Sequence, residues 1–406
     1  MNARVSVPPR STMTSDVVNG DLEVGRHAIV RGTQPQARVK VSGTVHCEGD
    51  NTFECSLSAE NLEAEDTVTI QGDLEVEDAV EVEDGRLEVF GKMAAKNVDV
   101  DNSLYAHKDL TANEVEVGGR LRVDGNTKAE DIDVGGAFEA KGEVTAEDVD
   151  VGGTFSSESK VDIKNLDVGG TATVAGGKIS CVDVGGTFRS NNALEFEKID
   201  VGGTVKLTGE SKGKEIEVGG SLEVKGDLEF EEIEVGGVVA ITGLAQGGRM
   251  EVGGKVDVDG SLRLSGTLKV GGRVDISGEL TTRNIEIGGV LRARKATAEE
   301  SVEVGGSITT GEGVAARFVE VGRRGEVHGP IRAEEVIIGR DAHVEDVYGK
   351  TLLLRSGAGA QNIYGEDVTI ESHCCIHGEL QYTSRLNLGE NVSLAKAPQK
   401  VDKLPS

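Results

Sequence analysis

Residues 233–237, Ile233-Glu234-Val235-Gly236-Gly237, are one copy of a five-residue phrase that returns through most of the chain. Successive copies are seventeen residues apart, except for one step of sixteen and one of eighteen. A short repeat with nearly constant spacing is typical of a solenoid, in which each repeat packs only against its neighbours. The Val-Gly-Gly or Ile-Gly-Gly copies begin at Val117, Val134, Val151, Val168, Val184, Val201, Val218, Val235, Val252, Val270, Ile287 and Val304.

The repeat that begins at Val218 indicates strands. Its apolar residues form three pairs with two-residue spacing: Leu222 with Val224, Leu228 with Phe230, and Ile233 with Val235. This spacing points both side chains of a pair to the same face of a strand. Helical solenoids are excluded, because no window has helical periodicity and Gly recurs too often. The sequence therefore predicts an all-β fold, a single-stranded parallel β-helix, right-handed, with triangular coils of about 17 residues and about 22 turns.

Matches to the repeat divide the chain into segments. Both ends are polar and contain prolines, so we expect flexible tails there. One interval near the N-terminus is too long for a single turn and predicts a loop or an irregular coil. The predicted segments are a tail over 1–19, the β-helix over 20–394 with a loop near 46–60, a Gly-Gly block over 115–306, divergent coils over 320–394, and a second tail over 395–406.

Composition limits the partners. The chain has 71 acidic and 43 basic residues and a formal net charge of -28, which disfavours nucleic acid and acidic membranes. Residues 1–13 lack the apolar run of a signal peptide, and no segment reaches the roughly 18 apolar residues of a membrane span. The five cysteines show no framework spacing, so we expect reduced thiols in a cytoplasmic protein.

An acidic residue precedes most of the Gly-Gly corners. If the turns stack in register, these side chains lie ~5 Å apart, and each like-charge pair costs on the order of 1 kcal/mol in water. The column is either a stripe that binds cations or docks a partner, or a charged face that keeps molecules from sticking side by side; the second reading is favoured. This acidic column contains Asp133, Asp150, Asp167, Asp183, Asp200, Glu217, Glu234 and Glu251.

Two other motifs contain residue types that bind ligands. Gly pairs cradle phosphate where one Gly-rich turn precedes a helix, but here a dozen copies occur without a helical pattern. We expect corners in which Gly supplies backbone angles that other residues resist. In the segment 372–377, the alternation of inward and outward residues in the predicted coil points Cys374 inward. It points His373, Cys375 and His377 outward, which splits the potential metal ligands between two faces. No catalytic, cofactor or metal site is assigned, and no enzymatic activity is expected.

The less regular coils near the C-terminus resemble those of the bactofilins, a family of polymer-forming cytoskeletal proteins. The resemblance is carried by Gly325-Glu326-Val327-His328-Gly329-Pro330-Ile331-Arg332-Ala333-Glu334-Glu335-Val336, by Ala342-His343-Val344-Glu345-Asp346-Val347-Tyr348-Gly349, and by Gly378-Glu379-Leu380. It implies a right-handed β-helix, assembly end to end into filaments without nucleotide, and a scaffolding role. About 22 turns make a longer β-helix than is typical of the family.

Physical reasoning also favours self-assembly, because an open β-helix end exposes unpaired backbone groups and apolar core. We expect a homopolymer, with other cytoskeletal or envelope-associated proteins as further partners of the tails. The alternatives are a β-helical enzyme of acyltransferase or polysaccharide-lyase type and a monomeric binding rod. The predicted polymerisation contacts are Val24, Val41, Val45, Tyr364, Ile370, Tyr382, Leu386, Leu388 and Val392.

Overall fold

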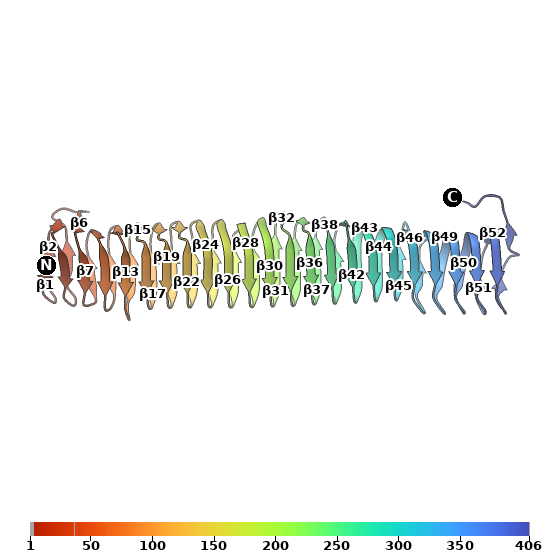
Figure 1. Ribbon diagram of the computed structural model, residues 1–406, viewed down its shortest axis with the longest axis horizontal. Helices are drawn as coiled ribbons and strands as arrows, with labels where there is room; N and C mark the ends of the chain where they lie inside the picture. Colours follow the sequence, from red (N-terminus) through yellow and green to blue (C-terminus); the bar gives the residue numbers. More distant parts are fainter. Residues whose placement is uncertain (1–3, 36, 406) are drawn as a thin grey trace. The chain divides into compact units, whose positions relative to one another are not determined.

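The computed structural model describes residues 4–35 and 37–405, which form 54 strands and no helix. The chain divides into two compact units, Met1–Gly202 and Gly203–Ser406. Within each unit, parallel strands of successive turns lie side by side (Figure 1). The chain makes about 23 turns of about 17 residues, so the predicted β-solenoid is confirmed with one more turn than expected.

Each turn contains three strand positions. In unit 1, β22 (Asp131–Val134) ends at a Gly-Gly corner and is a pre-corner strand, and β23 (Ala137–Ala140) is the post-corner strand. β24 (Val144–Val151) begins as the third strand and continues as the next pre-corner strand. In unit 2, the repeat at Val218 forms β33 (Glu215–Val218), β34 (Ser221–Lys225), β35 (Leu228–Glu229) and β36 (Glu232–Val235), as its apolar pairs predict.

The core lies inside the turns and is built from the alternating residues of every strand. On β22, Ile132 and Val134 are buried, whereas Asp131 and Asp133 are exposed. The parallel register sets Val134 against Val151, so apolar residues stack into continuous columns. Burying one such aliphatic side chain contributes about 1.5–3 kcal/mol, which makes these columns the main source of stability.

The Gly-Gly corners need glycine because neighbouring turns approach closely. A Cβ built on Gly135 would lie 2.3 Å from the carbonyl oxygen of Gly118, and one built on Gly152 would lie 2.4 Å from that of Gly135. Neither glycine is among the positive-φ residues, so the predicted corner is confirmed but the expected reason, unusual backbone angles, is wrong. The whole Gly-Gly block therefore depends on backbone packing between turns.

The inserted residues near the N-terminus lie in a different place from the predicted loop. The segment 46–60 belongs to a regular turn formed by β7 (Thr44–Cys47), β8 (Asn51–Phe53) and β9 (Ser56–Ala59). The extra residues fall instead between β5 (Ile29–Arg31) and β6 (Arg38–Val41), where the spacing between paired turns rises from 17 to 23 residues, as in Thr12↔Ile29 and Ile29↔Thr52. Gln36, in this insertion, lies outside the described residues.

Candidate functional site: the end turns and the acidic column

The last turn of unit 2 is a complete turn of three strands. The final residues of β52 (Leu380–Leu388) form its pre-corner strand, with Leu386 and Leu388 paired to Val368 and Ile370 of β50 (Gly359–Ile370). β53 (Ser393–Leu394) follows the corner, and β54 (Gln399–Lys400) pairs with the start of β52. Strands thus reach residue 400, inside the predicted tail over 395–406, whose last residue lies outside the description.

This last turn has an open apolar edge. Leu388 is 45% exposed, and Leu386 and Val392 are half-buried, although they occupy inward positions. One turn inside, Tyr382 is half-buried and Ile370 is 1% exposed, and Tyr364, two turns inside, is 9% exposed. Of the six predicted contacts in this region, three line the end turn, Leu386, Leu388 and Val392, and three lie within the stack, Tyr382, Ile370 and Tyr364.

Stacked rings hold together the third strands that lie two and three turns inside the open edge. The ring centroids of Tyr348 and Tyr364 are 4.9 Å apart, and the Arg332 guanidinium lies 4.2 Å from the centroid of Tyr348. Burial, followed by the nearby Glu379 carboxylate, raises the pKa of Tyr364 above its usual value. A neutral, stacked Tyr364 supports the start of β52, which pairs with it one turn inside the last turn.

The first described turn begins earlier than predicted. β1 (Arg4–Val7), β2 (Thr12–Thr14) and β3 (Val17–Val18) pair with β4 (Asp21–Val24), β5 and β6, so strands occupy most of the predicted tail over 1–19, whose residues 1–3 lie outside the description. Each of these three strands has a second edge, opposite the one that pairs with β4, β5 or β6. Among the described residues, this second edge pairs with no strand.

The N-terminal contacts predicted from the sequence are covered by this first turn. Val24, Val41 and Val45 are at most 2% exposed and lie inside the stack, because β1–β3 pack on the turn that contains Val24 and Val41. The end surface consists instead of β1–β3, where Met13 is half-buried at an inward position, paired with the buried Val30; Val17 is 59% exposed but points outward, like its partner Lys40. The candidate contact surface at this end is therefore formed by β1–β3 and not by Val24, Val41 and Val45.

The first and last turns share one strand order. Each starts with a pre-corner strand, β1 in one and the end of β52 in the other, and continues with a post-corner and a third strand. The pre-corner sequences also match: Arg4-Val5-Ser6-Val7 and Arg385-Leu386-Asn387-Leu388 both read arginine, apolar, small polar, apolar. A first turn placed on a last turn would therefore continue all three strand positions in register.

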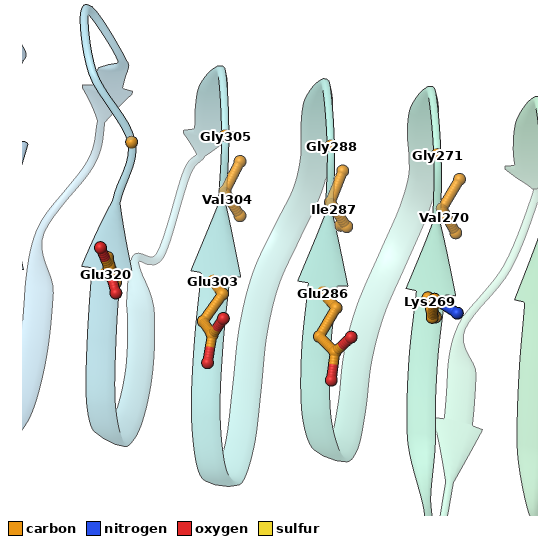
Figure 2. Close-up of a pocket in the computed structure, with 11 residues that line it drawn as sticks. Lys269, Val270, Gly271, Glu286, Ile287, Gly288, Glu303, Val304, Gly305 and Glu320 are labelled. Carbon is orange, nitrogen blue, oxygen red and sulfur yellow. The ribbon is translucent and has the colours of Figure 1, made fainter.

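The acidic column exists as predicted in each unit. In unit 1 the strand register sets Asp133 against Asp150, Asp150 against Asp167, and Asp167 against Asp183, which faces Asp200. In unit 2, Glu217 faces Glu234, which faces Glu251. Figure 2 shows the later part, where Glu286 and Glu303 project from neighbouring strands beside Lys269, at a shallow depression of about 460 Å³.

Like-charge repulsion in the column shows at Asp167. Burial, then the neighbouring Asp183 and Asp150 carboxylates, raise its pKa above the usual value. Because the folded state binds this proton more tightly than the unfolded chain, the stabilisation is present at low pH and is lost as pH rises through the folded pKa. At neutral pH, the ionised acidic column therefore destabilises the folded state.

Asp167→Asn is expected to raise the free energy of unfolding at pH 7 by about 0.5 kcal/mol, because it removes two like-charge contacts. Urea titration followed by circular dichroism at low salt measures the change, and the gain should shrink as the pH falls toward 4. Asp162→Asn is the control, since Asp162 faces Thr145 and Lys178 rather than other acids. An equal gain in both variants would contradict repulsion within the column.

A surface cluster that the sequence reading missed lies on the post-corner strands β14 (Arg86–Val89), β17 (Ser103–Ala106) and β20 (Arg120–Val123) and their corners. The Phe90 and His107 rings stack with centroids 4.2 Å apart, and His107 lies 3.8 Å from the Tyr105 centroid. The Arg122 guanidinium lies 4.9 Å from the Tyr105 ring. We call Arg86, Tyr105, His107, Arg120 and Arg122 with Phe90 the arginine-aromatic patch.

Asp124 fixes the geometry of this patch. It accepts hydrogen bonds from the Tyr105 hydroxyl at 2.7 Å and from the Arg122 Nε at 3.3 Å, and the Lys141 Nζ lies 2.8 Å away. Burial alone would raise its pKa, but the hydrogen bonds from Lys141, Tyr105 and Arg122 outweigh burial and lower it to about 2. Asp124 thus remains ionised and holds Tyr105 and Arg122 in place.

In the segment 372–377, the cysteine and histidine side chains lie on two faces, as the alternation of inward and outward residues predicts. Cys374 is buried and its Sγ donates to the Arg355 carbonyl at 3.2 Å, whereas His373 and His377 are exposed and Cys375 is half-buried. Burial raises the pKa of the Cys374 thiol. Within 4–35 and 37–405, no group of three or more His, Cys, Asp or Glu side chains is arranged to hold a metal ion.

The fold defines the class of this chain, a three-sided parallel β-solenoid. Comparison with protein-family models, with curated proteins and with solved structures gave no match. In the part of the chain that the structure describes, no helix could span a membrane.

Proposed function

We propose that this protein is a structural, bactofilin-like scaffold that assembles end to end, without nucleotide, into filaments. The observation that carries the proposal is the match between the first turn, β1–β3, and the last turn, formed by the end of β52 with β53 and β54. Stacking one on the other continues the parallel register with no gap. Because the two turns agree in strand order and direction, a continued parallel register joins the first turn of one copy to the last turn of the next, which is head-to-tail assembly.

Two kinds of unsatisfied group support the proposal. The open edges present backbone donors and acceptors, and each such group costs about 1–3 kcal/mol if it is buried without a partner. They also present apolar side chains at inward positions, namely Leu388, which is 45% exposed, and Met13, which is half-buried and paired with the buried Val30. A junction satisfies both at once, because strand pairing supplies the hydrogen bonds and the apolar side chains pack between the turns.

The junction has a characteristic response to salt. Arg4 and Arg385 occupy equivalent positions in the two end strands and would lie ~5 Å apart in a head-to-tail contact. Their repulsion is weakened by salt, as is the mutual repulsion of chains with a net charge of -28. We therefore expect assembly to strengthen between low and physiological ionic strength.

Sedimentation velocity of the full chain without nucleotide tests this function. The expected result is a sedimentation coefficient that increases with protein concentration and with salt, together with filaments in negative-stain images. A single slow species over a wide range of protein and salt concentration would contradict the proposal. We place the scaffold in the cytoplasm, which agrees with five free cysteines, of which Cys47, Cys55 and Cys374 are buried.

A further inference from the structure

We propose that the arginine-aromatic patch of unit 1 is a lateral docking site for the acidic face of a second copy of this chain. The proposal does not depend on assembly through the ends, because it concerns the sides of the solenoid. The patch surrounds a depression of about 540 Å³ lined by Arg86, Ser103, Tyr105, Arg120 and Arg122. In a chain with a net charge of -28, three arginines around one depression form an unusual site of positive charge.

Two of these arginines are available to a partner. Arg86 and Arg120 are exposed, and neither has an ion pair or side-chain hydrogen bond within the described residues. The register sets Arg86 against Ser103 and Ser103 against Arg120, so the two guanidinium groups flank a small residue and lie two turns apart. At ~4.8 Å per turn, their spacing along the solenoid is about 10 Å.

The third arginine and the rings form a fixed floor. Arg122 is held by Asp124 and lies over Tyr105, and the ring stack continues through His107 to Phe90, which is 42% exposed. His107 is also held, since its Nε2 lies 3.0 Å from a Glu88 carboxylate oxygen. A preformed surface loses little conformational freedom when a partner binds.

The matching surface is a block of six carboxylates on the pre-corner strands of the same unit. The register stacks the residues in two adjacent columns over three turns, and all six are exposed: Glu114, Asp131 and Asp148 in one column, and Glu116, Asp133 and Asp150 in the other. None of them forms an ion pair within the described residues. The column of Asp133 thus belongs to a wider acidic face.

Charge spacing favours a second copy over another polyanion. Both surfaces repeat with the rise of the same solenoid, so Arg86 and Arg120 of one copy meet every second carboxylate of its neighbour when the two axes are parallel. A flexible polyanion would have to be ordered into that spacing at an entropic cost. At ~0.1 M salt, charges more than about 10 Å apart are screened, so contact pairs dominate over the net repulsion of the two chains.

Charge reversal tests the docking in the full chain carrying Leu386→Asp and Leu388→Asp, which removes assembly through the ends. R86E/R120E is expected to weaken the lateral dimer at ~0.1 M salt by at least about tenfold in sedimentation equilibrium. The control R189E/K178E changes the net charge equally on exposed positions outside the patch and should leave the dimer intact. Equal weakening by both variants would overturn the proposal.

Dimer formation in a mixture of two charge-reversal variants tests the docking most strictly. E116K/D133K/D150K reverses one acidic column, and alone it should also dimerise more weakly. Mixed with R86E/R120E, it should restore the dimer, because its native patch meets the native acidic column of the other variant, and its reversed column meets the reversed patch. Failure of the mixture, or binding of heparin or single-stranded DNA to the patch without any dimer, would overturn the proposal. If the chain does not assemble through its ends, the same measurements apply to the parent chain, so the two proposals fail separately.

Discussion

The Leu386→Asp, Leu388→Asp double variant is expected to lose assembly through the ends while keeping its fold. Both leucines point inward at the open edge of the last turn, where Leu388 is 45% exposed in the isolated chain. A head-to-tail junction would bury them, and burying an unpaired carboxylate costs several kcal/mol. The critical concentration for assembly should therefore rise by at least about 100-fold.

Pelleting and negative-stain imaging measure that rise, and circular dichroism verifies the strands. Asn387→Asp is the matched control, because Asn387 lies between the two leucines but points outward and is exposed. It adds a negative charge at the same end without entering the apolar edge, so its critical concentration should change only a few-fold. Filaments of unchanged length in the double variant would rule out this end as the contact.

Gly152→Ala is expected to destabilise unit 1 by about 2–3 kcal/mol, because an inserted methyl group forces the backbones apart. The new Cβ would lie 2.4 Å from the Gly135 carbonyl oxygen, which belongs to the neighbouring turn and cannot rotate away. Urea denaturation followed by circular dichroism measures the loss. The free energy of unfolding should fall further when Gly135→Ala is added, since that Cβ meets Gly118 in the same way.

Gly311→Ala is the control for this effect. A Cβ there would approach no heavy atom closer than 3.8 Å, the carbonyl oxygen of Arg294, so the change should stay within about 0.5 kcal/mol. Similar losses at Gly152 and Gly311 would contradict the claim that contact between turns sets the requirement for glycine.

The interior of the repeat could be predicted from the sequence because two periods coincide. Apolar residues two apart, as in Ile233 and Val235, define each strand, and the seventeen-residue step places each strand on its equivalent in the next turn. The prediction failed where Gly-Gly is missing. Val39 and Val41, in the third strand β6, have the same two-residue spacing as the apolar pair of a pre-corner strand, so the spacing alone does not distinguish the two positions, and the loop predicted near 46–60 lies too far along the chain.

The arginine-aromatic patch could also have been predicted from the sequence. Phe90 and His107, Tyr105 and Arg122, and Asp124 and Lys141 are all pairs seventeen residues apart, so the period alone makes them neighbours. Such mixed aromatic and charged pairs stand out less in the sequence than the apolar and acidic columns do, because none of them is repeated in the next turn. By contrast, the exposure of Leu388 and the burial of Val24 depend on where the first and last turns stop, which the period leaves open.

Disulfide trapping between copies tests the head-to-tail contact most directly. Ser6 and Asn387 are exposed, outward-facing residues in the equivalent end strands β1 and β52. In a continuous register their Cα atoms would be ~4.8 Å apart, within the range that a disulfide spans. Chains with Cys181→Ser and Cys375→Ser, one carrying Ser6→Cys and the other Asn387→Cys, would be mixed and oxidised.

Assembly through the first and last turns predicts rapid formation of the mixed disulfide dimer, with much slower dimer formation by either variant alone. Thr145→Cys, an exposed position away from both ends, serves as the partner in the control mixture and should form mixed dimers only slowly. Mixed dimers of Ser6→Cys and Asn387→Cys that form no faster than this control would contradict assembly through the first and last turns.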